Sequence, residues 1–223
     1  FENVEFHYSD DPMLVLNQIN LNADAGQTVA LVGETGAGKT TIIKLLTRFH
    51  DPTAGCVRVD GVDLRTVTQQ SLRRQMGMVL QDPFLFSGTI ADNIRFARPD
   101  ASDEEVAGAA TAIGVDRVAA RFPEGLAHVV REGGAGLSAG ERQLISIARA
   151  LLADPRILIL DEATSNIDRP AERAIEEAFD TLLRGRTSVI IAHRLTTVRR
   201  ADEILVVEHG RIVQRGRYDD LLA

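Results

Sequence analysis

The chain has 223 residues, of which 44% are hydrophobic, which is enough to bury a sizeable core and excludes a disordered segment. Its formal net charge of −7 argues against a broad electrostatic grip on nucleic acid, which requires a clustered basic surface. Cys56 is the only cysteine, so an intrachain disulfide is excluded. A membrane-spanning helix needs about twenty predominantly apolar residues, and no apolar run of this sequence approaches that length.

The first 32 residues are predicted to form short strands separated by turn signals. The last of them, residues 29 to 32, is a continuous apolar run and therefore a buried strand. Residues 33 to 40 follow it directly and fit G-x-x-x-x-G-K-[ST], the pattern of a phosphate-binding loop. Because the strand supplies the expected context, a glycine-rich turn without a nucleotide is the weaker alternative.

Such a loop lets backbone N–H groups and the positive end of the following helix point at a phosphate. Lys39 is expected to reach the β- and γ-phosphates of a nucleotide, and Thr40 is expected to hold Mg²⁺ through its hydroxyl. The residues predicted to contact the nucleotide here are Gly33, Glu34, Thr35, Gly36, Ala37, Gly38, Lys39, Thr40 and Thr41.

The rest of the chain alternates between strand and helix patterns, with one interruption. Helices are predicted at residues 41 to 49, 71 to 74, 141 to 153, 170 to 183 and 195 to 200. Strands are predicted at residues 57 to 59, 76 to 80, 157 to 160, 188 to 191 and 204 to 207. A helical stretch from residue 90 to about 126, with Ser102 as an N-cap, interrupts the alternation, and a glycine-rich loop at 129 to 140 follows it. Apolar strands between helices predict an α/β fold with a mostly parallel sheet.

Several polar residues come directly after apolar strands, at the edge of an α/β sheet where ligands bind. Asp161 is placed to bind Mg²⁺ directly or through a water, and Glu162 to polarise a water for attack on the γ-phosphate. Gln81 is a weaker candidate for contacting Mg²⁺ or the attacking water. His193 either satisfies a backbone group, as histidines at strand ends often do, or donates a hydrogen bond to the γ-phosphate.

A second phosphate-binding device is indicated at residues 137 to 141, where a glycine-containing segment opens a helix. Ser138 is equally well explained as a plain N-cap of that helix. One nucleotide cannot easily be served by two such devices of the same chain from one direction. The helix start at Ser138 is therefore a candidate for contacting a nucleotide held by another subunit.

In their order, these motifs resemble the ATP-binding domain of an ABC transporter over essentially the whole chain. The matches are Tyr8 as the aromatic residue that stacks on adenine, residues 33 to 40 as Walker A, Gln81 as the Q-loop, residues 137 to 141 as the signature motif, residues 157 to 161 as Walker B, Glu162 as the catalytic glutamate, residues 165 to 168 as the D-loop and His193 as the switch histidine. The resemblance implies binding of ATP and Mg²⁺, with metal contacts from Thr40, Gln81 and Asp161. It implies catalytic roles for Lys39, Gln81, Glu162 and His193, and nucleotide contacts from Ser138, Gly140 and Glu141.

The resemblance also implies a fold: a P-loop NTPase (RecA-like) core with an N-terminal antiparallel β subdomain and an inserted α-helical subdomain. Residues 1 to 81 are expected to hold the β subdomain and the first part of the core with Walker A. Residues 82 to 152 are expected to form the helical subdomain, ending in the signature helix, and residues 153 to 223 the second part of the core.

Residues 81 to 90, 93 to 94 and 130 to 134 are similar to the exporter branch of this family, in which a transmembrane domain precedes the ATPase domain. The chain does not begin with Met, so we expect it to be the cytoplasmic part of a longer membrane-embedded polypeptide, most naturally in the cell membrane. Family members pair head to tail, as homodimers or heterodimers, with each ATP between Walker A of one domain and the signature motif of the other. That pairing accounts for two phosphate-binding devices in one chain.

The signature motif departs from the usual L-S-G-G-Q, because Ala139 replaces the first glycine and Glu141 replaces the glutamine. Ser138 and Gly140 remain, and we expect function to survive. Two alternatives are a soluble ABC-type ATPase acting on nucleic acid or the ribosome, and a nucleotide-dependent interaction module without turnover. The acidic balance weighs against the first, so no nucleic-acid partner is expected, and the presence of Glu162 and His193 weighs against the second.

Overall fold

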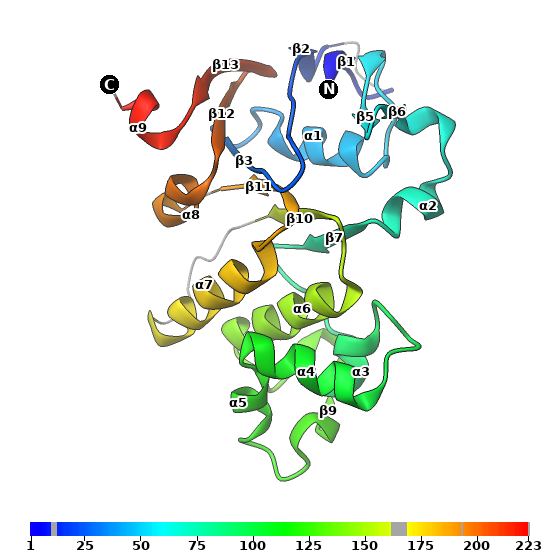
Figure 1. Cartoon of the computed structure of the whole chain (residues 1–223), viewed down its shortest axis with the longest axis vertical. Coiled ribbons are helices and arrows are strands. Elements are labelled where there is room, and N and C mark those ends of the chain that lie inside the picture. Colours follow the sequence, from blue (N-terminus) through cyan, green and yellow to red (C-terminus); the bar gives the residue numbers. More distant parts are fainter. Residues whose placement is uncertain (10–12, 162–168, 193, 223) are drawn as a thin grey trace. The chain divides into compact units, whose positions relative to one another are not determined.

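The computed structural model describes residues 1–9, 13–161, 169–192 and 194–222 (Figure 1). The chain forms two compact units, each with buried apolar residues of its own, such as Leu31 and Ile159 in the first and Ile94 and Ile145 in the second. The first unit comprises Phe1–Met76, Arg156–Ala163 and Arg186–Ala223, and the second comprises Gly77–Pro155 and Thr164–Gly185. The predicted subdomain boundaries after residues 81 and 152 describe a different division and stay a prediction.

The first unit holds most of a sheet whose strands run in the order β13-β12-β3-β11-β10-β7, and of β7 only Met76 belongs to this unit. The strands are β3 (Thr28–Val32), β7 (Met76–Val79), β10 (Ile157–Asp161), β11 (Thr187–Ile191), β12 (Glu203–Glu208) and β13 (Arg211–Gly216). β3 lies between β11 and β12 and pairs parallel with both, and β10 pairs parallel with β11. β13 runs antiparallel to its neighbour, β12. The predicted α/β fold with a mostly parallel sheet is therefore confirmed.

A small antiparallel sheet in the same unit has the order β2-β1-β4, with β1 (Glu2–Phe6), β2 (Leu16–Ile19) and β4 (Ala54–Cys56). A hairpin of β5 (Arg58–Val59) and β6 (Val62–Asp63) follows it, which confirms the predicted antiparallel β elements near the N-terminus. The described helical segments of this unit are α1 (Lys39–Leu46), η1 (Leu64–Thr66), α2 (Gln69–Arg73), α8 (Leu195–Arg200) and α9 (Tyr218–Leu221).

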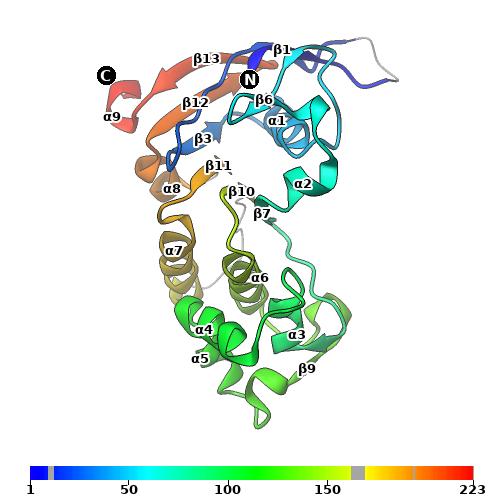
Figure 2. The ribbon, with the colours of Figure 1, turned by 45° about the vertical axis from the view of Figure 1, so that its right-hand side comes forward.

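The second unit is mainly helical and is organised around α6 (Ala139–Ala153), which packs against α3, α4 and α7 (Figure 2). Its other described elements are β8 (Gly88–Thr89), α3 (Ile90–Arg95), α4 (Asp103–Ile113), α5 (Val115–Ala119), η2 (Gly125–Ala127), β9 (Val129–Val130), η3 (Glu132–Gly134) and α7 (Arg169–Leu183). α6 is buried along much of its length because apolar residues recur at helical spacing, among them Leu144, Ile147, Ala148 and Leu152.

Several elements of the structure differ from the predicted ones in their bounds or type. The helix predicted from residue 141 begins at Ala139, since Ser138 caps it, and Ser102 caps α4 as predicted. The predicted loop at 129 to 140 contains β9, which pairs with β8, and the turn η3. β13 and α9 were not predicted. In the described part of the chain, no helix is long and apolar enough to cross a membrane.

Candidate nucleotide-binding site

The phosphate loop connects β3 to α1 in the first unit, as its motif predicts. Lys39 is 6% exposed, and its Nζ donates hydrogen bonds to the backbone oxygens of Gly33 at 2.6 Å and Glu34 at 2.9 Å. Burial lowers the pKa of Lys39, and the negative charge of Asp161 opposes that shift. Two carbonyl groups of the loop thus hold the Lys39 ammonium, which lies near the Asp161 carboxylate at the end of β10.

Two glycines of the loop serve different ends. A Cβ at Gly33 would lie 2.1 Å from the backbone oxygen of Val207, so this position admits only glycine. Gly36 has a φ of +86°, and a Cβ there would meet no protein atom within 4 Å. The loop is therefore closed against β12 at Gly33, whereas at Gly36 no protein atom limits the approach of a ligand to the backbone.

The remaining loop residues divide by exposure. Gly33, Glu34, Thr35, Gly36 and Thr40 are exposed, whereas Ala37, Gly38, Lys39 and Thr41 are buried. Gly38 is the N-cap of α1 and has no side chain, so no N-cap side chain bonds the first N–H groups of the helix, which point toward the loop. This geometry suits an anion, because the N-terminal end of a helix carries a partial positive charge.

Tyr8 lies beside the same helix. Its hydroxyl is 3.3 Å from Oγ1 of Thr41 and 3.4 Å from Nζ of Lys44. Its ring meets Phe6 edge to face at 4.9 Å and His50 at 5.4 Å between centroids. Tyr8 is half-buried and held at both its hydroxyl and its ring, as a platform for a base must be.

The residues at the strand tips are only partly described. Asp161 is the last residue of β10 and is half-buried. Glu162, His193 and the D-loop at 165 to 168 lie outside the described residues, so their predicted roles stay predictions. Gln81 is exposed and follows β7 in the second unit, whereas Lys39 and Asp161 belong to the first unit.

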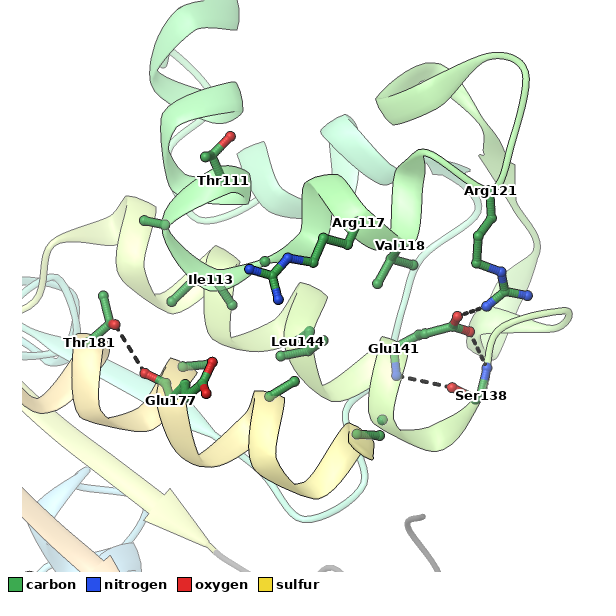
Figure 3. A pocket seen from close by; sticks show the side chains of 16 residues that line it. Thr111, Ile113, Arg117, Val118, Arg121, Ser138, Glu141, Leu144, Glu177 and Thr181 are labelled. Atoms are coloured by element: carbon green, nitrogen blue, oxygen red, sulfur yellow. Dashed lines mark hydrogen bonds and ion pairs between the residues drawn. The ribbon is translucent and has the colours of Figure 1, made fainter. Parts of the chain in front are cut away.

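The predicted signature motif opens α6 in the second unit with a reciprocal cap. Oγ of Ser138 accepts a hydrogen bond from the Glu141 N–H at 3.2 Å, and Oε2 of Glu141 accepts one from the Ser138 N–H at 2.8 Å (Figure 3). Oε1 of Glu141 pairs with the Arg121 guanidinium. Both readings of Ser138 are compatible here, because a hydroxyl that accepts one hydrogen bond still carries a hydrogen to donate.

Two residues that the sequence analysis gave no role hold the segment after Gln81 in place. Asn93 is 1% exposed, and its side chain bonds the N–H and C=O of Phe86, at 2.9 Å each, and the oxygen of Thr89 at 3.1 Å. Arg149 of α6 donates to the oxygens of Asn93 at 2.8 Å and Phe84 at 3.1 Å. The available signal was an arginine among the buried apolar residues of α6, a position that a charge occupies only with partners.

Comparison with known proteins agrees with these motifs. Residues 16–165 match the family described as ABC transporter. Over all of the chain, it is 54% identical to the uncharacterized ABC transporter ATP-binding protein YknV of Bacillus subtilis. It is likewise 51% identical to the fatty acid ABC transporter ATP-binding/permease protein of Mycobacterium tuberculosis.

Among solved structures, a bacterial Atm1-family ABC exporter with ATP bound superposes with a TM-score of 0.91 and 43% identity over 100% of this chain. The chain spans 37% of the Bacillus protein, 35% of the Mycobacterium protein and 39% of the exporter chain. The match covers the phosphate loop and the signature motif in one family model, and the relatives extend it to both ends of the chain. The chain therefore belongs to the ABC transporter family, and it is an ATP-binding and ATP-hydrolysing domain of the kind found in that family.

Proposed function

We propose that this domain binds MgATP in its phosphate loop, closes on it with a second ATP-binding domain, and powers export through an attached transmembrane domain. The observation that carries the proposal is the loop itself, with Lys39 buried and fixed by two carbonyls and with open space at Gly36. The exporter likeness supplies the direction of transport. The proposed location is the cytoplasmic face of a membrane, most naturally the cell membrane.

Mg²⁺ fits the donor set of the loop. The described candidates are the exposed hydroxyl of Thr40 and the carboxylate of Asp161, both oxygen donors of the kind that Mg²⁺ prefers. Among the described residues, no cluster of three or more His, Cys, Asp or Glu side chains could hold a metal ion. These two donors leave room for the phosphates and waters that Mg²⁺ usually keeps as ligands, with Gln81 as a further predicted contact. Bound there, Mg²⁺ would neutralise phosphate charge.

The chemistry of hydrolysis is mainly positioning and charge neutralisation. In this proposal Lys39 holds the β- and γ-phosphates, Glu162 orients or deprotonates the attacking water, and His193 holds the γ-phosphate. Glu162→Gln should leave ATP binding intact and slow turnover by roughly 10² to 10⁴, the usual contribution of a general base. Turnover within a few-fold of the parent chain, measured by phosphate release, would remove Glu162 from this role.

The second ATP-binding domain, identical or different, would approach the signature motif. Ser138 and Gly140 would meet the γ-phosphate of the ATP that the partner holds, through the Ser138 hydroxyl and the first N–H groups of α6. Capping supports this proposal because Glu141 keeps the Ser138 side chain at the helix start. ATP-dependent dimer formation by the chain, followed by sedimentation, tests it.

Coupling to the transmembrane domain is proposed to run through Gln81, residues 82 to 90 and residues 131 to 133. The two segments are tied together, since β8 pairs with β9 and the Gly133 N–H donates to the oxygen of Leu85 at 2.9 Å. Phe84, Phe86 and Phe96 are 49%, 40% and 56% exposed there, which suits an apolar docking surface. Crosslinks from the cytoplasmic loops of the membrane domain that mapped elsewhere would contradict this assignment.

The two alternative functions have less support from the sequence and its relatives. A soluble ATPase acting on nucleic acid or the ribosome would not explain relatives named as ATP-binding/permease proteins. A module without turnover would lack steady-state phosphate release, which the same assay on the parent chain measures directly. ATP hydrolysis by the chain together with loss of activity on Lys39→Met would support the proposal.

A further inference from the structure

The last residue of the signature motif, Glu141, carries a negative charge where the family usually has a neutral glutamine. Its carboxylate is held in place at both oxygens, by the Ser138 N–H and by Arg121. The Glu141 side chain is 12% exposed, so its charge cannot turn away into solvent. The charge therefore lies within the first turn of α6, beside Ser138.

In the proposed function, that charge disfavours binding of a phosphate at the signature motif. If Ser138 and Gly140 meet a γ-phosphate, a fixed carboxylate in the same turn repels the incoming phosphate. It also takes up part of the favourable potential that the start of α6 offers to an anion. A neutral glutamine in the same position would make the same cap without this repulsion.

Arg121 can neutralise this charge. It lies just beyond α5, and its guanidinium pairs with Oε1 of Glu141, while Oε2 accepts the Ser138 N–H (Figure 3). A typical exposed ion pair contributes little, because both side chains are mobile and water screens them. Here Glu141 is already fixed by the cap, and only Arg121, at 59% exposure, has to be ordered.

We propose that Arg121 is a positioning residue for the signature motif, which neutralises Glu141 and thereby lets Ser138 and Gly140 accept a γ-phosphate. The inference rests on the proposed function, in which a second domain brings its ATP to this motif. Arg121 lies outside all the motifs that resemble the ABC transporter family. The Arg121–Glu141 ion pair has no net charge, as the glutamine of the usual signature has none.

The chain offers a matched control. Arg117 and Arg121 both line a cavity of about 510 Å³ that α5, α6 and α7 bound together with the end of α4. Figure 3 shows Arg117 pointing toward the opposite side of this cavity from Glu141. Arg117→Met therefore removes the same charge from the same cavity without breaking the Glu141 pair.

The experiment compares Arg121→Met, Arg117→Met and the double variant Arg121→Met/Glu141→Gln with the parent chain. The readouts are the ATP concentrations that give half-maximal hydrolysis and half-maximal dimer formation. We expect Arg121→Met to raise both by about three- to tenfold and Arg117→Met to raise them less than about twofold. The double variant should return to within about twofold of the parent, and the Arg121→Met effect should shrink in high salt.

Folding is controlled separately. Arg121 is largely exposed, so Arg121→Met should leave the urea midpoint of nucleotide-free unfolding close to that of the parent. If Arg121→Met does not fold, Arg121→Lys carries the test, and it should stay within about twofold of the parent because it keeps the charge. Equal effects of Arg121→Met and Arg117→Met, or no recovery in the double variant, would overturn the inference. A parent chain that neither hydrolyses ATP nor dimerises with it would instead refute the proposed function.

Discussion

Gly36 allows the phosphate loop to be tested apart from the stability of the fold. Gly36 and Gly26 both have left-handed backbone, with φ of +86° and +80°, and a Cβ at either would meet nothing within 4 Å. Gly36 lies in the phosphate loop, where a bound phosphate is expected, whereas Gly26 lies in the turn before β3. Alanine at Gly36 should therefore block a phosphate, and alanine at Gly26 is a matched control for backbone strain.

The magnitudes follow from the geometry. A left-handed alanine costs about 1–2 kcal/mol, and the lower entropy of its unfolded chain offsets about 0.4–1 kcal/mol. Both variants should thus lose about 1 kcal/mol of unfolding free energy without nucleotide. At about 100 times its Kd, ATP should add about 2.7 kcal/mol to the parent chain and to Gly26→Ala. A tenfold weaker affinity in Gly36→Ala would lower that increment by about 1.4 kcal/mol.

The assay is urea unfolding of the three chains with and without ATP and Mg²⁺. Equal losses without nucleotide, combined with a reduced ATP increment in Gly36→Ala alone, are the expected result. If Gly36→Ala kept the full increment, a bound phosphate would not approach the loop at Gly36. A much larger loss in Gly36→Ala without nucleotide would show that the space at Gly36 is not open.

Three further predictions concern other parts of the domain. Asn93→Ala should lower the free energy of unfolding by about 1–3 kcal/mol, measured in urea, because it leaves partly buried backbone groups of Phe86 and Thr89 without their side-chain partner. Tyr8→Ala should weaken ATP binding, measured by titration, by about tenfold, because it removes a stacking contact of about 1–3 kcal/mol. Tyr8→Phe keeps the ring and should weaken binding by less than about threefold. Chelation of Mg²⁺ should abolish phosphate release while fluorescent ATP analogues still bind, because Lys39 and the loop N–H groups need no metal; loss of analogue binding on chelation would contradict this order of contributions.

Local sequence rules predicted much of the fold. The apolar runs that became β3, β10, β11 and β12 alternate with helices, and a parallel sheet buries such strands on both faces. Ser102 was predicted as a cap because it precedes acidic residues that favour a helix start. β13 was not predicted because its two apolar residues, Ile212 and Val213, are adjacent and do not alternate with polar ones. Its place depends on antiparallel pairing with β12.

The nucleotide site was predictable where residues close in sequence make it, as in the loop around Lys39. It was not predictable where partners far apart in the chain meet, because no local pattern encodes them. Asn93 and Arg149 are 56 residues apart, and Arg121 and Glu141 are 20 apart. Such pairs arise from packing between helices, which fixes which polar side chains have to satisfy each other.

The distribution of these groups separates binding from turnover. Within the described residues, every predicted contact to the chain's own ATP except Gln81 lies in the first unit, from Tyr8 through the phosphate loop to Asp161. The signature motif and its support, from Arg121 to Glu141, lie in the second unit. If the signature motif contacts a nucleotide held by another domain, changes in the motif or in Arg121 should leave the affinity of the monomer for ATP unaltered. Their effect should appear only when two domains meet, and so in dimer formation and hydrolysis.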